Sequence, residues 1–384
     1  MQKNTLGKLG IVAVMTLYMA QMGSMIVAPG LAKMAAQFPD NNYLLISTLP
    51  QLAIIPASLL AGVLAGKKMS FRRLAVLGSF LFAVGGTAAA FVKSFGAILV
   101  CRAVFGFGLG LNYPLANALV LGSFEGQKQA RMMGIGTLAM NAGGVIFQTV
   151  AGILADISWN ATFYPHLFGF VAMIFAFFLP DTREDAAEEK QAGSKEKMGA
   201  YIWVIAGVLL IMNMLMYPLI MNISLVFEYR GVGSAAIAGI ALSLYTVGGC
   251  VAGLTYSTFY RIFKKYTITA TYVGVAIAIL LILFGKTAGV IAAGLFVIGY
   301  FLMIYTPAWM SRIAAKTPAS TIPFATSLSM SIMSIGGFIC TYWVAAIGAI
   351  TGDTLFAPTR ITLFVILAMA LIFTVFNPYK GDDI

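Results

Sequence analysis

The sequence predicts an all-α membrane protein with twelve transmembrane helices in two pseudo-symmetric six-helix bundles. The 384 residues are 60% hydrophobic and only 10% charged, whereas charged residues make up about a quarter of an average soluble protein. The apolar residues gather in runs of roughly 20, the length that a helix needs to cross about 30 Å of hydrocarbon. One long charged segment divides these runs into two equal sets.

Apolar runs bounded by charged residues, Pro or Gly define the twelve expected spans. They cover residues 9–29, 44–65, 74–92, 96–120, 132–154, 163–180, 201–226, 234–259, 268–285, 289–311, 324–349 and 360–377. The charged segment follows the sixth run, so we expect an N-terminal bundle at 1–180, a cytoplasmic linker at 181–200 and a C-terminal bundle at 201–384.

The basic residues indicate how the spans are oriented. Eighteen Lys and Arg residues fall on the side of the N-terminus and five on the opposite side, with Arg102 inside a span. By the positive-inside rule, both termini are expected in the cytoplasm and the protein in the cytoplasmic membrane. The net charge of +11 therefore does not indicate a nucleic-acid partner.

The two halves repeat several small residues at an offset of 193. Gly106 and Pro114 in the fourth span match Gly299 and Pro307 in the tenth. Met140, Gly143 and Gly144 in the fifth span match Met333, Gly336 and Gly337 in the eleventh. Parallel repeats of this kind occur in transporters.

The fourth span carries a polar stripe. At about 100° per residue, Arg102, Gly106, Tyr113 and Asn117 share one helix face. A guanidinium facing lipid is costly, so this face is expected to look into the bundle or a wet cavity, where Arg102 would favour an anionic solute. The alternative is that Arg102 extends to the outer interface.

These residues also resemble a family signature. Ile98, Arg102, Gly106 and Gly108 are similar to the fourth-helix motif of the major facilitator superfamily of secondary transporters, here of prokaryotic type. The loop after the second span resembles the cytoplasmic motif of that family, although Gly66 stands where the family has an acid. The loop residues that the resemblance marks as conformational candidates are Gly62, Lys67, Arg72, Arg73, Glu125 and Arg131. Glu125 is expected to pair with Arg72 or Arg73.

The resemblance implies alternating access to a midplane site, with the first, fourth, seventh and tenth spans lining a cavity. Polar residues within the spans are then candidates for substrate contact: Arg102, Tyr113, Asn117, Gln21, Gln51, Asn141, Gln148, Asn213, Tyr217, Tyr305 and Trp309. For each of them an interhelical hydrogen bond is the alternative interpretation.

Proton coupling needs a titratable group, and the acids lie in loops or near span ends. Glu228 is the best-placed candidate and Asp156 the second, with a surface pair to Arg230 as the alternative role of Glu228. His166, the only histidine, is expected at the membrane interface.

We therefore predict a transporter of a small organic solute, with an anionic solute and proton coupling as further expectations. A drug/proton antiporter is an alternative, although Gly144 is followed by Val145 and not by the proline typical of such proteins. A non-transporting membrane receptor is a second alternative. The spans carry no paired acids, metal cluster or Ser/His set, which argues against an enzyme. The three cysteines have no paired spacing, and we expect no disulfide, metal or cofactor. The expected partners are the solute, the bilayer and protons, and the expected state is a monomer.

Overall fold

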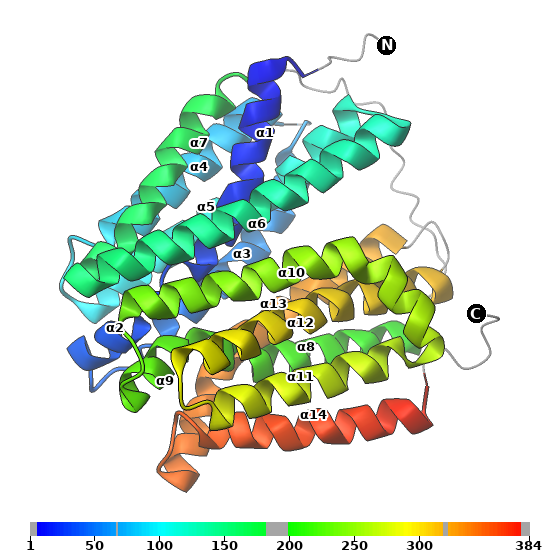
Figure 1. The fold of residues 1–384 in the computed structure, drawn as a ribbon. Coiled ribbons are helices and arrows are strands. Elements are labelled where there is room, and N and C mark those ends of the chain that lie inside the picture. The colour runs from blue at the N-terminus through cyan, green and yellow to red at the C-terminus, as the bar shows by residue number, and fades with distance from the viewer. Residues whose placement is uncertain (1–5, 67, 182–198, 318–321, 378–384) are drawn as a thin grey trace. The chain divides into compact units, whose positions relative to one another are not determined.

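The chain divides into two compact units, Met1–Gln191 and Ala192–Ile384, shown as a ribbon in Figure 1. The structure is a computed structural model that describes residues 6–66, 68–181, 199–317 and 322–377. Each unit is built from helices whose bounds follow the apolar runs of the sequence.

The N-terminal unit contains the first six expected spans. Its elements are α1 (Lys8–Ala20), η1 (Gln21–Met25), η2 (Ala28–Gly30), α2 (Leu31–Gln37), α3 (Leu45–Leu64), α4 (Phe71–Ala88), α5 (Phe95–Ser123), α6 (Gly126–Ile157), η3 (Asn160–Leu167) and α7 (Phe168–Ala176). The first span differs from expectation because its α-helix ends at Ala20 and continues as short 3₁₀ segments. The sixth begins as the 3₁₀ segment η3.

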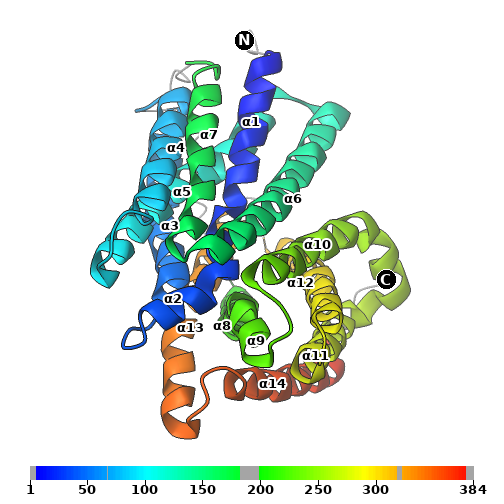
Figure 2. The ribbon, with the colours of Figure 1, turned by 60° about the vertical axis from the view of Figure 1, so that its left-hand side comes forward.

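The C-terminal unit contains the remaining six spans. Its elements are α8 (Ala200–Met221), α9 (Ile223–Arg230), α10 (Ala235–Phe263), η4 (Lys264–Tyr266), α11 (Thr267–Phe284), α12 (Ala288–Lys316), α13 (Ile322–Thr351) and α14 (Ala357–Val375). Helices α11 and α14 pack side by side, as both ribbon views show (Figure 2).

Ten continuous helical stretches of the described residues are long and apolar enough to cross a membrane. One of them, Ala235–Phe284, holds two spans because η4 joins α10 to α11 without a break. The sixth span is absent from the ten because η3 and α7 together cover only residues 160–176, which falls one residue short of the 18 required. With these two adjustments the helices account for all twelve expected spans.

The repeated glycines occupy matching contacts within the two units. A Cβ on Gly106 of α5 would lie 2.6 Å from Pro50 Cα in α3, and one on Gly299 of α12 would overlap the Tyr245 carbonyl in α10. The fourth span therefore packs closely on the second, and the tenth packs in the same way on the eighth. Small residues allow this approach because membrane helices associate through close packing.

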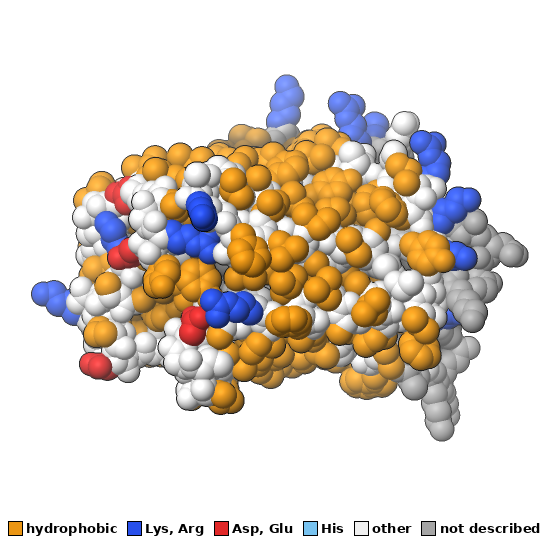
Figure 3. Space-filling view, turned by 60° about the horizontal axis from the view of Figure 1, so that its bottom comes forward, with side chains coloured by type: hydrophobic (Ala, Val, Ile, Leu, Met, Phe, Trp, Pro, Cys, Tyr) orange, Lys and Arg blue, Asp and Glu red, His pale blue; other side chains and the backbone are white. Residues whose placement is uncertain are grey.

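The helices bury apolar residues of every size within each unit, and further large apolar residues are exposed on the outside. In the N-terminal unit Val14, Leu17, Leu74 and Leu115 belong to one buried cluster. Figure 3 shows a face of the molecule on which hydrophobic side chains cover the middle, while Lys and Arg side chains gather toward its ends. This distribution fits helices whose outer surface contacts lipid.

Candidate functional site

The first group of candidate residues lies where α1 changes into η1. Tyr18 Oη donates to Asn117 Oδ1 of α5 at 2.6 Å, and Gln21 Nε2 donates to the Tyr113 carbonyl at 3.4 Å. We call Tyr18, Gln21, Tyr113 and Asn117 the polar seam. It joins η1, the first of the two 3₁₀ segments in the first span, to α5 near Pro114. Irregular backbone inside membrane proteins is tolerated where it is buried in protein or lines a water-filled cavity.

Exposure differs within the polar seam. The side chain of Tyr113 is 45% exposed, Asn117 is partly buried, and Gln21 is buried. The phenol hydroxyl of Tyr113 can both donate to and accept from a polar solute. The seam therefore brings together three of the residues expected from the sequence and adds Tyr18, which sequence reasoning missed.

Arg102 occupies a separate, fully buried position. Its side chain is 0% exposed, its Nε donates to the Ile46 carbonyl of α3 at 2.7 Å, and its Nη1 lies 3.1 Å from His166 Nε2. The guanidinium also sits 4.2 Å above the Phe105 ring. The alternative in which Arg102 extends to the outer interface is therefore wrong, because the side chain turns toward α3 and η3. Solute binding by Arg102 stays a prediction.

The expected interfacial position of His166 is also wrong. Its ring is 0% exposed and its edge packs against Phe105. Its Nδ1 lies 2.8 Å from the Phe163 carbonyl. A carbonyl accepts only, so we assign the proton to Nδ1, which leaves Nε2 to accept from Arg102. His166 is thus a neutral partner for a buried cation.

The stripe of the fourth span is consequently divided between two neighbouring helices. Arg102 and Gly106 contact α3, whereas Asn117 contacts α1. The helix period correctly places these residues on one side of α5, but it does not indicate which neighbour each of them meets.

Two further candidates of the N-terminal unit, Asn141 and Gln148, are buried in α6, and Gln51 is partly buried in α3. Close to them, a Cβ on Gly143 would lie 2.7 Å from the Met19 carbonyl. The fifth span therefore packs directly on the first. At about 100° per residue, Asn141 and Gln148 lie on another face of α6 than Gly143.

The candidates of the C-terminal unit form a second buried group. Tyr305 Oη lies 3.3 Å from Tyr272 Oη and donates to the Val208 carbonyl at 3.4 Å. Trp309, one turn further along α12, packs on Tyr305 and on Phe373 of α14. Tyr305 and Trp309 are 2% and 1% exposed. Sequence reasoning missed Tyr272, the single tyrosine of a mainly apolar run.

The seventh span carries the remaining candidates of this unit. Asn213 Nδ2 donates to the Met333 carbonyl of α13 at 2.7 Å, and Tyr217 is buried. This contact of Asn213 is an interhelical hydrogen bond, the alternative to solute contact. It uses the amide nitrogen and not the amide oxygen, which can accept a hydrogen bond from a solute.

The two carboxylates considered for proton coupling lie on the surface. Glu228 and Asp156 are both exposed. The structure records no ion pair between Glu228 and Arg230 among the described residues, because Arg230 donates instead to the carbonyls of Ile282, Leu283 and Gly285 at 2.6 Å each. The surface pair offered as the alternative role of Glu228 is therefore wrong.

The cytoplasmic loop differs from expectation in its acidic partner. Arg72 Nη1 and Arg73 Nε each lie 4.0 Å from a carboxylate oxygen of Asp181, which also accepts from Ser70 Oγ. The expected pairing of these arginines with Glu125 is thus replaced by one with Asp181, because the end of the sixth span lies beside the start of α4. Asp181 is the first residue after the sixth apolar run. This position could have indicated it as the acidic partner of the two arginines.

The backbone explains the glycine that replaces the family's acid in this loop. Gly66 has φ = 76°, a left-handed backbone conformation that glycine adopts without steric cost. Its N–H donates to the Met69 carbonyl at 2.9 Å. Gly62 and Arg131 are exposed, whereas Lys67 lies outside the described residues.

Comparison with known proteins agrees with this architecture of two six-helix units. Solved structures that align over nearly the whole chain include a POT family transporter in complex with 5-aminolevulinic acid, at 13% identity over 97% of this chain and 96% of that one, with a TM-score of 0.74. The nucleoside transporter NupG aligns at 11% identity over 95% and 98% of the two chains, with a TM-score of 0.77. The human organic anion transporter MFSD10 aligns at 16% identity over 95% and 98%, with a TM-score of 0.65. These likenesses show the fold.

The sequence itself identifies the family. The profile of the Major Facilitator Superfamily matches residues 11–341, and the chain belongs to this family. A curated relative, the multidrug resistance protein 3 of Bacillus subtilis (strain 168), is 24% identical over 155 residues. The matched part covers 38% of this chain and 29% of that relative's length.

Proposed function

We propose that this protein is a secondary transporter that moves a small organic solute across the cytoplasmic membrane by alternating access. The observation that carries the proposal is the family match over residues 11–341. The repeated glycine contacts support it, because two equivalent units are the parts that rock about a shared site in transporters of this architecture. We further propose that both termini face the cytoplasm, as the distribution of Lys and Arg predicts.

Within the N-terminal unit, we assign solute contact to the polar seam. Tyr113 is its most exposed member, and the 3₁₀ segment η1 begins at Gln21. A mid-helix stretch of 3₁₀ often marks a hinge. A helix that bends at η1 would change the hydrogen bonds of Gln21 and Tyr18 to α5, which would link solute contact to movement of the first span.

Flux into vesicles tests this proposal. The purified full chain is reconstituted, and solutes that raise its melting temperature are tested for uptake with and without a pH gradient. Saturable flux of one such solute is expected, with flux driven by the gradient if protons are coupled. Ligand binding without flux would support a receptor instead.

The polar seam is tested with Tyr113→Phe, which removes one hydroxyl. Loss of one hydrogen bond to the solute should raise KM about fivefold. The control is Tyr342→Phe, the same change at an exposed tyrosine of α13, which should leave KM unchanged. Equal effects of the two substitutions would remove the seam from the site.

Multidrug efflux is a second candidate function, favoured by the similarity to the multidrug resistance protein. The carboxylates of the described spans lie at their ends, which argues against an antiporter that exchanges protons deep in the membrane. Extrusion of several unrelated cationic dyes from inverted vesicles would support efflux. Transport of a single chemical class would support the solute transporter.

A further inference from the structure

The C-terminal unit contains a cavity of about 490 Å³ where α9 and α11 end and α14 begins. This volume falls within the range of small-molecule sites. Two arginines, Arg230 and Arg360, and apolar residues that include Leu283, Phe284 and Phe364 line it. We propose that this α11–α14 pocket binds an anionic phospholipid, with the phosphate between the arginines and an acyl chain against the apolar wall.

Arg230 is held in place before any ligand arrives. Its Nη1 donates to the carbonyls of Ile282 and Gly285, and its Nη2 donates to that of Leu283. These carbonyls belong to the C-terminal end of α11, where helix carbonyls lack partners in the helix. Because the acceptors are neutral, the guanidinium keeps its full charge. A fixed cation lowers the ordering cost of binding an anion.

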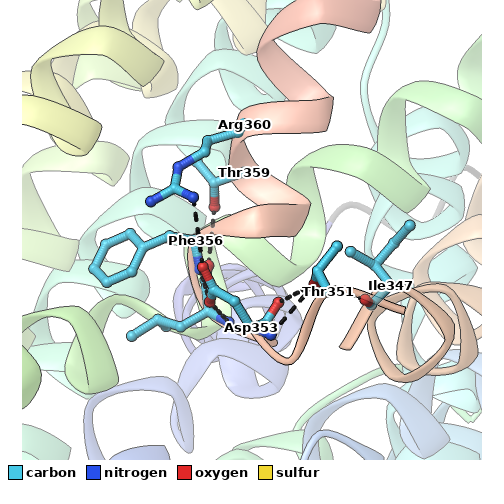
Figure 4. A network of polar contacts seen from close by, with 7 residues as sticks. Ile347, Thr351, Asp353, Phe356, Thr359 and Arg360 are labelled. Carbon is cyan, nitrogen blue, oxygen red and sulfur yellow. Dashed lines mark hydrogen bonds and ion pairs between the residues drawn. The ribbon is translucent and has the colours of Figure 1, made fainter. Parts of the chain in front are cut away.

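Arg360 is the more adaptable of the two arginines. Its Nη1 lies 3.8 Å from Asp353 Oδ2, and its side chain is 63% exposed. Figure 4 shows that Asp353 faces both Arg360 and the start of α14, where its Oδ1 accepts from the backbone N–H groups of Leu355 and Phe356 at 2.9 and 2.8 Å. Asp353 is therefore held by the helix cap, and an exposed ion pair of this length contributes little. Arg360 can turn to a phosphate without disturbing that cap.

The charges of the pocket leave a net positive site. Arg230 and Arg360 provide two positive charges, and Asp353 at the rim provides one negative charge. The guanidinium of Arg230 also lies 5.1 Å from the centroid of the Phe356 ring, which stabilises a cation on that side. A phosphodiester with one negative charge complements this arrangement, whereas a zwitterionic headgroup adds a positive charge to it.

The apolar wall selects a lipid over a soluble anion. Phe284 and Phe364 are each more than 70% exposed, and so is Tyr229 at the rim. Tyr229 and Phe284 lie at helix ends, the level at which aromatic side chains meet headgroups. Phe364 lies two turns into α14, at the depth of an acyl chain. An acyl chain would cover the phenylalanine side chains, while the two guanidinium groups would donate to the phosphate oxygens of the headgroup. A soluble phosphate compound would leave this wall unused.

Native mass spectrometry of the purified full chain tests the proposal. The protein is mixed with equal amounts of phosphatidylglycerol and phosphatidylcholine, and the retained lipids are counted. Wild type should retain phosphatidylglycerol preferentially. Arg360→Gln should weaken that affinity about fivefold, the effect of one basic residue near anionic lipid. The control is Lys286→Gln, which removes the same charge from an exposed residue at the end of α11 outside the pocket lining, and it should change the affinity less than twofold.

A second variant separates lipid from soluble anion. Phe364→Ala keeps both arginines but shortens the apolar wall, so it should weaken phosphatidylglycerol binding while the weak binding of glycerol 3-phosphate stays unchanged. Equal retention of the two lipids would overturn the proposal, as would equal effects of Arg360→Gln and Lys286→Gln. Displacement of the lipid by glycerol 3-phosphate at equal concentration would likewise show that the acyl chain makes no contribution.

Discussion

Removal of the His166 acceptor should destabilise the N-terminal unit more than removal of the Arg102 cation. Arg102 Nη1 lies 3.1 Å from His166 Nε2, in a position where neither side chain is exposed. His166→Leu leaves the guanidinium buried with one acceptor fewer. Removing one partner of a buried charge costs about 3–5 kcal/mol.

Arg102→Met is expected to cost less. It leaves the Ile46 carbonyl and His166 Nε2 without this donor, at about 1–3 kcal/mol each. It also removes a buried charge whose desolvation costs several kcal/mol, so the net loss should be about 1–3 kcal/mol. In the double variant no guanidinium needs the acceptor. The double variant should therefore be about 2 kcal/mol more stable than the sum of the two single losses predicts.

Unfolding of the purified protein in detergent measures these differences, with His166→Gln as the matched control. The Gln side chain keeps an oxygen that can accept from Arg102, so most of the stability should return. If His166→Gln and His166→Leu were equally unstable, or the two single losses simply added, the role of His166 as the neutral partner of Arg102 would be refuted.

Three other changes give separate tests. Gly106→Ala should lower the free energy of unfolding by about 1–3 kcal/mol because the added Cβ meets the α3 backbone. The control Gly122→Ala, with open space around it, should be neutral or slightly stabilising. Equal stabilities of the two variants would contradict the close contact. Asp181→Asn should lower stability by about 1 kcal/mol at low salt, and the difference should vanish at 1 M salt because surface ion pairs are screened; a loss that persists at high salt would indicate another cause. Glu228→Gln should abolish accumulation driven by a pH gradient while exchange of solute continues, if this carboxylate carries the proton; unchanged accumulation would remove Glu228 from the mechanism.

The hydropathy of the sequence was sufficient to place twelve spans, because bilayer thickness sets one length for every apolar helix. The hydropathy did not indicate the 3₁₀ segments inside the first and sixth spans. In the first span, a Cβ on Gly23 would overlap the Phe82 ring, and a Cβ on Gly30 would overlap the Thr162 side chain. These contacts favour glycine, but they involve residues far along the chain.

The contacts of the polar residues were decided by tertiary structure. Periodicity placed Arg102 and Asn117 on one side of α5, because 3.6 residues per turn fixes the relative direction of side chains on a helix. Their partners, the Ile46 carbonyl and His166 for Arg102 and Tyr18 for Asn117, belong to other helices. Which of these groups meet depends on how each helix is rotated and how closely the glycines let the backbones approach. The sequence by itself determined the spans, their repeat and the family, whereas helix packing determined which polar groups are joined.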